Sequence, residues 1–170
     1  MRRWTLLLAL PALSCAAPDP KVELEVLGLE TYWAVESSRG QERYIAPVVR
    51  FEVRNKGAVP QLSVEVSAGF RRANDEGVFV EWGGDFLRVS SSRQPLQPGE
   101  RRLVVLKSDA RYHSPGTPES RFAHAEFRDP RVEVYMRAGS SNWVKFGEAA
   151  VERRVGSRSV PDDVRDAAPR

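Results

Sequence analysis

Residues 49–57 read Val-Arg-Phe-Glu-Val-Arg-Asn-Lys-Gly, so apolar and charged side chains alternate until a glycine closes the run. Successive side chains of a β-strand point to opposite faces. This period of two therefore indicates a strand with one face in a core and one face in water. Phe51 is expected on the buried face, between Val49 and Val53. Segment 55–57 predicts a hairpin turn, because its glycine can adopt positive φ.

Other parts of the chain repeat this alternation, with turn residues between the runs. We expect seven to nine antiparallel strands in about 130 residues, which is typical of an all-β, immunoglobulin-like sandwich of two sheets. The continuously apolar run 103–106 predicts a more central strand. The other expected strands contain residues 22–26, 62–70, 78–82, 132–136 and 143–151, and the expected turns are 74–77, 83–84, 98–99 and 139–142.

Segment 108–130 interrupts the pattern, since it shows no alternation and is longer than an ordinary connection between strands. Thr117 suits a helix N-cap, and Pro118 suits the first helical position. We therefore expect one short helix in the 108–130 loop, packed on the sandwich through Phe122 and Phe127.

The composition supports one folded domain and excludes several classes of site. Of 170 residues, 41% are hydrophobic and 29% are charged, which is enough to build a core. Basic residues number 26 and acidic residues 23, and this mixed surface argues against a dedicated nucleic-acid binder. The single cysteine rules out an internal disulfide, and with two histidines it leaves few ligands for zinc.

The N-terminus predicts a signal peptide over residues 1–14. Arg2 and Arg3 supply a positive start, and the predominantly apolar segment 4–13 follows them. A helix needs about 20 apolar residues to cross a bilayer, so this segment is too short for a membrane span. We therefore expect the protein to be exported.

Residues 12–15, Ala-Leu-Ser-Cys, resemble the lipobox of bacterial lipoproteins. In that family a small residue precedes a cysteine, which receives a diacylglycerol and becomes the new N-terminus. Ser14 fits this pattern, whereas Ala12 stands where leucine is usual. The resemblance implies lipidation at Cys15 and a lipid anchor in a bacterial membrane.

The residues after the cysteine imply a tether and a location. Residues 15–20 form a short proline-bearing linker between the lipid and the folded domain. In lipoproteins of enteric bacteria, an aspartate after the cysteine keeps the protein in the inner membrane. Ala16 therefore favours the outer membrane, facing the periplasm or the surface. The alternative is an ordinary secretory signal cleaved near residues 16–17, with Cys15 as a hydrophobic residue.

FxLYD-type and related immunoglobulin-like modules of bacterial envelope proteins resemble this chain in segments 49–57, 62–70, 75–77 and 95–100. The motif that names the family is absent, because Ser-Ala-Gly-Phe-Arg-Arg follows Val66. The resemblance therefore implies a fold and an envelope setting, and it assigns no functional residue. We place the sandwich at residues 21–151 and expect a disordered tail at 152–170.

Few residues point to catalysis or to metal binding. His113 and His124 share the 108–130 loop with several carboxylates, so a metal site or a general base is one hypothesis there. The other hypothesis is two surface histidines in a polar loop. The nucleophile-elbow and phosphate-loop motifs are absent, and we expect no enzyme, cofactor or metal. Carboxylates that could suit calcium gather near one turn, where charged residues are common: Asp75, Glu76, Glu81 and Asp85.

The leading functional hypothesis is a non-catalytic, lipid-anchored module that binds another envelope protein, for example as a subunit of an envelope or secretion assembly. Arg111, Tyr112 and His113 form an amphipathic cluster in the 108–130 loop, and we expect them to contact the partner. In the alternative interpretation, Phe122 and Phe127 only plug one end of the sandwich. Neither a nucleic acid nor a small molecule is an expected partner.

Two further hypotheses belong to other classes. A carbohydrate- or peptidoglycan-binding module would need exposed aromatic rings, and Trp33, Trp82 and Trp143 are the candidates. A metal-dependent or hydrolytic enzyme would need the histidines of the 108–130 loop to converge with carboxylates.

Overall fold

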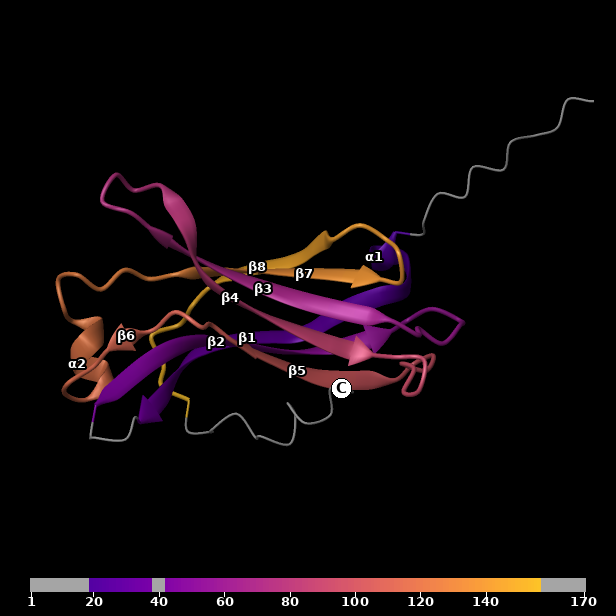
Figure 1. Ribbon diagram of the computed structural model, residues 1–170, viewed down its shortest axis with the longest axis horizontal. Helices are drawn as coiled ribbons and strands as arrows, with labels where there is room; N and C mark the ends of the chain where they lie inside the picture. Colours follow the sequence, from indigo (N-terminus) through magenta and orange to yellow (C-terminus); the bar gives the residue numbers. More distant parts are fainter. Residues whose placement is uncertain (1–18, 38–41, 157–170) are drawn as a thin grey trace, which may run out of the picture.

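The computed structural model describes residues 19–37 and 42–156, which form two antiparallel sheets packed face to face (Figure 1). The predicted all-β sandwich is confirmed, with eight strands in these two ranges. One sheet has the order β1-β2-β5, and β6 also pairs with β2. The other has the order β4-β3-β7-β8. The strands are β1 (Leu24–Ser37), β2 (Arg43–Asn55), β3 (Val64–Ala73), β4 (Phe79–Ser90), β5 (Arg101–Lys107), β6 (Tyr112–His113), β7 (Arg131–Ala138) and β8 (Val144–Ala150).

The core lies between the inner faces of the two sheets. Phe51 is buried there together with Val49 and Val53, which confirms the alternation predicted for β2. Among the residues that the structure describes, Trp33 on β1 is the largest side chain that is fully buried. The opposite sheet supplies side chains of the same parity from β3 and β7: Val64, Val66, Ala68, Phe70, Val132, Val134 and Met136.

The predicted hairpin at 55–57 is wrong, because β2 and β3 lie in different sheets. The buried side chain of Asn55 turns the chain away from β2. Its Nδ2 donates to the carbonyls of Val59 and Leu96, and its Oδ1 accepts from the N–H of Gly57. These contacts fix a crossing loop, and Leu62, predicted as a strand residue, lies exposed in that loop.

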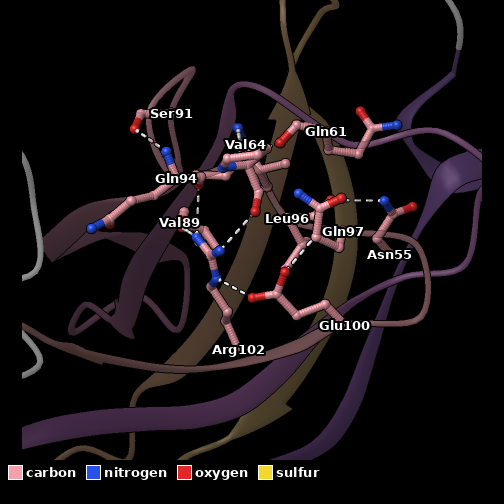
Figure 2. Close-up of polar contacts among 12 residues, drawn as sticks. Asn55, Gln61, Val64, Val89, Ser91, Gln94, Leu96, Gln97, Glu100 and Arg102 are labelled. Atoms are coloured by element: carbon pink, nitrogen blue, oxygen red, sulfur yellow. Dashed lines mark hydrogen bonds and ion pairs between the residues drawn. The ribbon is translucent and has the colours of Figure 1, made fainter.

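A second polar network holds the loop between β4 and β5 (Figure 2). The guanidinium of Arg102 donates to the carboxylate of Glu100 and to three backbone carbonyls of the chain before it. Glu100 also accepts from the N–H of Gln97. The turn predicted at 98–99 is confirmed, and Gly99 adopts a φ of 78°. The carbonyls bonded to Arg102 belong to Val89, Gln94 and Pro95.

Two other expectations for strands are wrong. The pair Gly83-Gly84 lies inside β4 rather than in a turn, where Gly83 packs so closely on Ser108 and Asp109 that a Cβ would not fit. Run 103–106 belongs to β5, which is an edge strand in the order β1-β2-β5, and its side chains alternate between buried and exposed. A continuous run of apolar residues therefore did not indicate a central strand in this protein.

The ends of the domain also differ from expectation. Residues 20–23 form a helical turn, α1 (Pro20–Glu23), because Asp19 caps it by accepting from the N–H of Lys21. Residues 152–156 are not a disordered tail, since they lie along β1. The N–H of Trp33 donates to the carbonyl of Arg154, and that of Gly156 donates to the carbonyl of Trp33. The predicted signal peptide, Cys15 and residues 157–170 lie outside the described residues.

The sandwich has two distinct ends (Figure 1). One end carries α1, which lines a surface pocket of about 390 Å³ together with the turn between β7 and β8. The opposite end carries α2 (Pro118–Phe122) and the projecting hairpin between β3 and β4. None of the helices in the described ranges has the length and apolarity needed to cross a membrane.

Candidate functional site

Helix α2 forms where the sequence predicts it and closes one end of the sandwich. The side chain of Thr117 accepts from the N–H of Ser120, which confirms the expected N-cap. The rings of Phe122 and Phe127 lie 5.9 and 5.3 Å from the ring of Trp33, measured between centroids. The two phenylalanines therefore plug the core, as the alternative interpretation expected.

Tyr112 is part of this plug and is buried, whereas a surface contact would need it to be exposed. It is only 6% exposed, and its ring lies 4.9 Å from that of Trp82. Its hydroxyl donates to the carbonyl of Arg128 and accepts from the N–H of Arg128 and from Nη1 of Arg72. One donor and two acceptor positions are thus all occupied, so Tyr112 has neither free area nor a free polar group for a partner.

Arg111 and His113 flank Tyr112 and remain exposed. The guanidinium of Arg111 lies 4.3 Å from the ring centroid of Tyr44 and donates to Glu36 over 3.2 Å. The ring of His113 lies 5.3 Å from that of Tyr44. The structure therefore brings two of the three predicted contact residues to one surface, beside an aromatic residue that sequence reasoning did not select.

Asp85 and Asp109, two of the carboxylates in the segments where a metal site was one hypothesis, have structural partners. Asp85 accepts from the N–H groups of Phe86 and Lys107, and Asp109 accepts from the N–H of Gly84. These bonds join the edge of β4 to the end of β5. In the described ranges, no group of three or more His, Cys, Asp or Glu side chains is placed to hold a metal ion.

The hairpin between β3 and β4 exposes apolar side chains at its tip. The turn predicted at 74–77 is confirmed, and Oδ1 of Asn74 accepts from the N–H groups of Glu76 and Val78. Val78, Phe79 and Val80 are all exposed although they are apolar. We call these three residues the hairpin tip. It projects beyond the sheet at the end that carries α2 (Figure 1).

The outward side of the sheet β4-β3-β7-β8 forms a second candidate surface, which we call the outer face. Register places Phe86, Ser67, Tyr135 and Lys145 side by side in one row across the four strands. The next row consists of Gly84, Gly69, Glu133 and Glu148. Small side chains thus lie between large ones, and a depression results.

This depression has a volume of about 290 Å³. Its floor contains Gly69, and a Cβ built on Gly69 would meet nothing within 4 Å, so the space above it is open. A volume of this size is at the lower end for small-ligand sites in proteins. We call it the hollow; it is lined by Ser67, Gly69, Arg71, Glu81, Glu133 and Tyr135.

Two aromatic rings stand on the outer face beyond the hollow. Phe86 and Trp143 are 51% and 39% exposed, and their centroids are 6.1 Å apart in an edge-to-face arrangement. The guanidinium of Arg137 lies 4.9 Å from the ring of Trp143. Of the three tryptophans considered from the sequence, Trp33 is buried and Trp82 packs partly buried against the core, so only Trp143 is exposed.

A buried carboxylate anchors this part of the outer face. Glu65 is 5% exposed and accepts hydrogen bonds from Arg88 and Arg137, the latter over 2.5 Å. Burial by itself raises the pKa of the Glu65 carboxyl, but the hydrogen bonds from the two arginines outweigh it, and the pKa lies below its ordinary value. The ion pairs orient Arg137 beneath Trp143.

Sequence reasoning did not find the outer face as a site. The run 62–70 displayed Ser67 and Gly69 on its polar side, but nothing in the sequence showed which residues stand beside them. Phe86 and Trp143 come from separate segments, and only the register of the sheet brings them together.

Comparison with known proteins does not assign a family. No family model matches the chain, and no curated protein matches it. Among solved structures, it is similar to the alkylpurine DNA glycosylase AlkC of Pseudomonas fluorescens bound to DNA (12% identity, TM-score 0.41, 78% of this chain and 30% of that chain). It is also similar to a β-glucuronidase of Bacteroides uniformis (15% identity, TM-score 0.40, 75% of this chain and 12% of that chain). The chain thus spans less than a third of either protein, and similarity at this level assigns no function.

Proposed function

We propose that this protein is a lipid-anchored, non-catalytic β-sandwich of the bacterial cell envelope that binds another envelope protein. The anchor rests on the sequence, where Ser14-Cys15 follows a short apolar segment. A diacylglycerol supplies two acyl chains, and two membrane signals are what stable anchoring requires. One version of this function is a subunit of an envelope or secretion assembly.

The exposed hairpin tip is the observation that supports protein binding most directly. The predicted tether, residues 15–20, leads into α1 at one end of the sandwich, and the hairpin tip lies at the other end (Figure 1). A sandwich anchored through Cys15 would therefore present the hairpin tip away from the membrane. Clustered exposed apolar side chains mark interaction surfaces in soluble domains.

The neighbourhood of the hairpin tip suits a protein partner. The guanidinium of Arg131 lies 5.4 Å from the ring of Phe79, and Arg71 donates to the carbonyl of Phe79. Aromatic residues and arginines are enriched at protein interfaces. Arg111 and His113 are exposed at the same end of the domain, and we propose that they extend this contact surface.

The anchor is tested by metabolic labelling with a fatty-acid analogue. We expect label on the wild-type chain and none on Cys15→Ser, because the thiol is the acceptor. Equal label on both chains would overturn the lipid anchor. Loss of label would leave the folded domain unchanged, so the purified soluble domain serves to test partner binding separately.

Partner binding is tested by co-purification from envelope extracts after mild cross-linking. We expect Phe79→Ala to lose the principal partner, whereas the control Val59→Ala should retain it. Val59 is 58% exposed and lines the same surface pocket as Pro20 of α1, so it lies at the α1 end and matches Phe79 in being apolar and exposed. Retention of every partner by Phe79→Ala, and by Arg111→Ala, would contradict the proposed surface.

A further inference from the structure

We further propose that the hollow on the outer face binds a neutral glycan chain. This proposal goes beyond the protein-binding function and rests on neither the lipid anchor nor the hairpin tip. It follows from three features of the outer face: an open floor, aromatic rings beside it, and polar groups whose bonding capacity is unused.

The floor admits a ring lying flat on the sheet. Gly69 pairs with Gly84 on one side and with Glu133 on the other, so two adjacent positions of the row lack side chains. The open space above Gly69 continues toward Ser67, which has the smallest side chain of its own row. Neighbouring strands are about 4.8 Å apart, so this gap is wide enough for a sugar ring.

Aromatic rings border the floor on the side of Ser67. Ser67 lies between Phe86 on β4 and Tyr135 on β7, and Trp143 leans against Phe86. Aromatic faces pack against the apolar C–H faces of sugars, and rigid aromatic rings lose little conformational entropy on binding. The exposed pair Phe86 and Trp143 therefore offers the stacking surface that buried Trp33 does not.

Polar groups around the hollow can bond to sugar hydroxyls. Within the described ranges, neither the hydroxyl of Ser67 nor the carboxylate of Glu81 has a hydrogen-bond partner. The hydroxyl of Tyr135 donates to Glu133 and keeps its acceptor positions. Glu81 is opposite Arg71, four residues along β3 from Ser67. Hydroxyl groups of a sugar both donate and accept, so successive rings of one glycan chain could bond to Ser67 and to Glu81.

The charge around the hollow favours a neutral ligand. Arg71 lies 3.7 Å from Glu133, and Lys145 bonds to the same carboxylate over 2.7 Å. Lys145 also pairs with Glu148, and Glu148 pairs with Arg131. Glu81 adds a third negative charge, so three basic and three acidic groups balance. A sulfated or carboxylated chain would meet Glu81 without a free cation to pair with, which costs binding energy.

Calorimetric titration with two β-1,4-linked tetrasaccharides tests this proposal, one of N-acetylglucosamine and one of glucose. We expect the wild-type soluble domain to bind at least one of them. Binding of the first identifies cell-wall-type chemistry, and binding of the second identifies an external glucan. If neither binds, the proposal is overturned.

Variants locate the binding on the hollow. We expect Gly69→Leu, whose Cβ would meet nothing within 4 Å and whose side chain would occupy the space above the floor, to weaken binding at least about tenfold. Glu81→Gln should weaken it too, and because Glu81 has no ion pair in the described ranges, the fold should be unaffected. Phe79→Ala at the hairpin tip and Leu103→Ala on the other sheet should bind like wild type. Undiminished binding by a folded Gly69→Leu variant would contradict the glycan site.

The same variants separate this proposal from the protein-binding function. If Gly69→Leu loses the protein partner and no tetrasaccharide binds to the wild type, the outer face binds protein and the glycan proposal fails. If Phe79→Ala loses the partner while tetrasaccharide binding persists, both proposals stand.

Discussion

The ring of Tyr112 lies 4.9 Å from the ring of Trp82, although the two residues come from strands in different sheets. Tyr112 belongs to β6, and Trp82 belongs to β4. Their contact closes the end of the sandwich over Trp33, whose ring is 5.9 Å from Tyr112. Tyr112 thus couples the loop 108–130 to both sheets.

Replacing Tyr112 should therefore destabilise the domain. We expect Tyr112→Ala to lower the free energy of unfolding by about 3–5 kcal/mol, because it removes a buried aromatic ring and leaves a cavity. Tyr112→Phe should cost about 1–2 kcal/mol, since it leaves the amide of Arg128 without an acceptor. Urea denaturation measures both. Arg111→Ala is the control and should stay within about 0.5 kcal/mol; an unfolding energy of Tyr112→Ala equal to that control would contradict the buried role.

Arg102 should hold the loop between β4 and β5. We expect Arg102→Ala to lower the free energy of unfolding by about 2–4 kcal/mol, because three carbonyls and the Glu100 carboxylate lose their donor. The neighbouring Arg101 is exposed and lies 3.6 Å from Glu52, so Arg101→Ala should change stability by at most about 0.5 kcal/mol. Thermal unfolding compares the pair, and equal losses would show that the network in Figure 2 does not stabilise the loop.

Glu65 should make the stability of the domain depend on pH in the acid range. Its folded-state pKa lies below the unfolded value of about 4.3, so its ion pairs contribute fully above that pH and are lost as the pH falls through the folded pKa. We expect Glu65→Gln to be less stable than wild type at neutral pH, by about 1–3 kcal/mol. This difference should shrink below about pH 4.

Urea unfolding of the wild type and of Glu65→Gln checks this expectation. The measurements run from pH 3 to pH 7, a range that brackets the ordinary carboxyl pKa of about 4.3. Glu52→Gln is the control, because its pair with Arg101 is exposed. A wild-type advantage that stays constant over the whole range would contradict the assignment of the pH dependence to Glu65.

The sequence predicted which side chains of a strand face the core better than it predicted which segments lie next to one another in the fold. Alternation placed Phe51 in the core correctly, because burial of every second side chain is visible in one strand alone. It failed at segment 55–57, since a turn that joins two strands of one sheet and a loop that crosses between sheets carry the same Asn and Gly residues. The crossing depends on the bond of Asn55 to Leu96, which is distant in sequence.

For the candidate sites too, local features were predictable from the sequence, whereas contacts between distant segments were not. A long loop carrying Arg111, Tyr112 and His113 correctly indicated an unusual segment, but the sequence did not show that Tyr112 faces Trp33. The residues of the outer face come from four separate segments of the sequence, and only the register of the sheet brings them together as one surface. Helix α2 was predictable because its cap and its proline are local signals.

Photo-cross-linking in living cells tests the proposed function most directly. A photoreactive amino acid replaces Phe79 at the hairpin tip, and a matched chain carries it in place of Val59 at the end near α1. We expect position 79 to give one predominant adduct with an envelope protein and position 59 to give none of that adduct. Adducts of equal yield at both positions, or no adduct at position 79 in a chain that is folded and exported, would contradict partner binding by the hairpin tip.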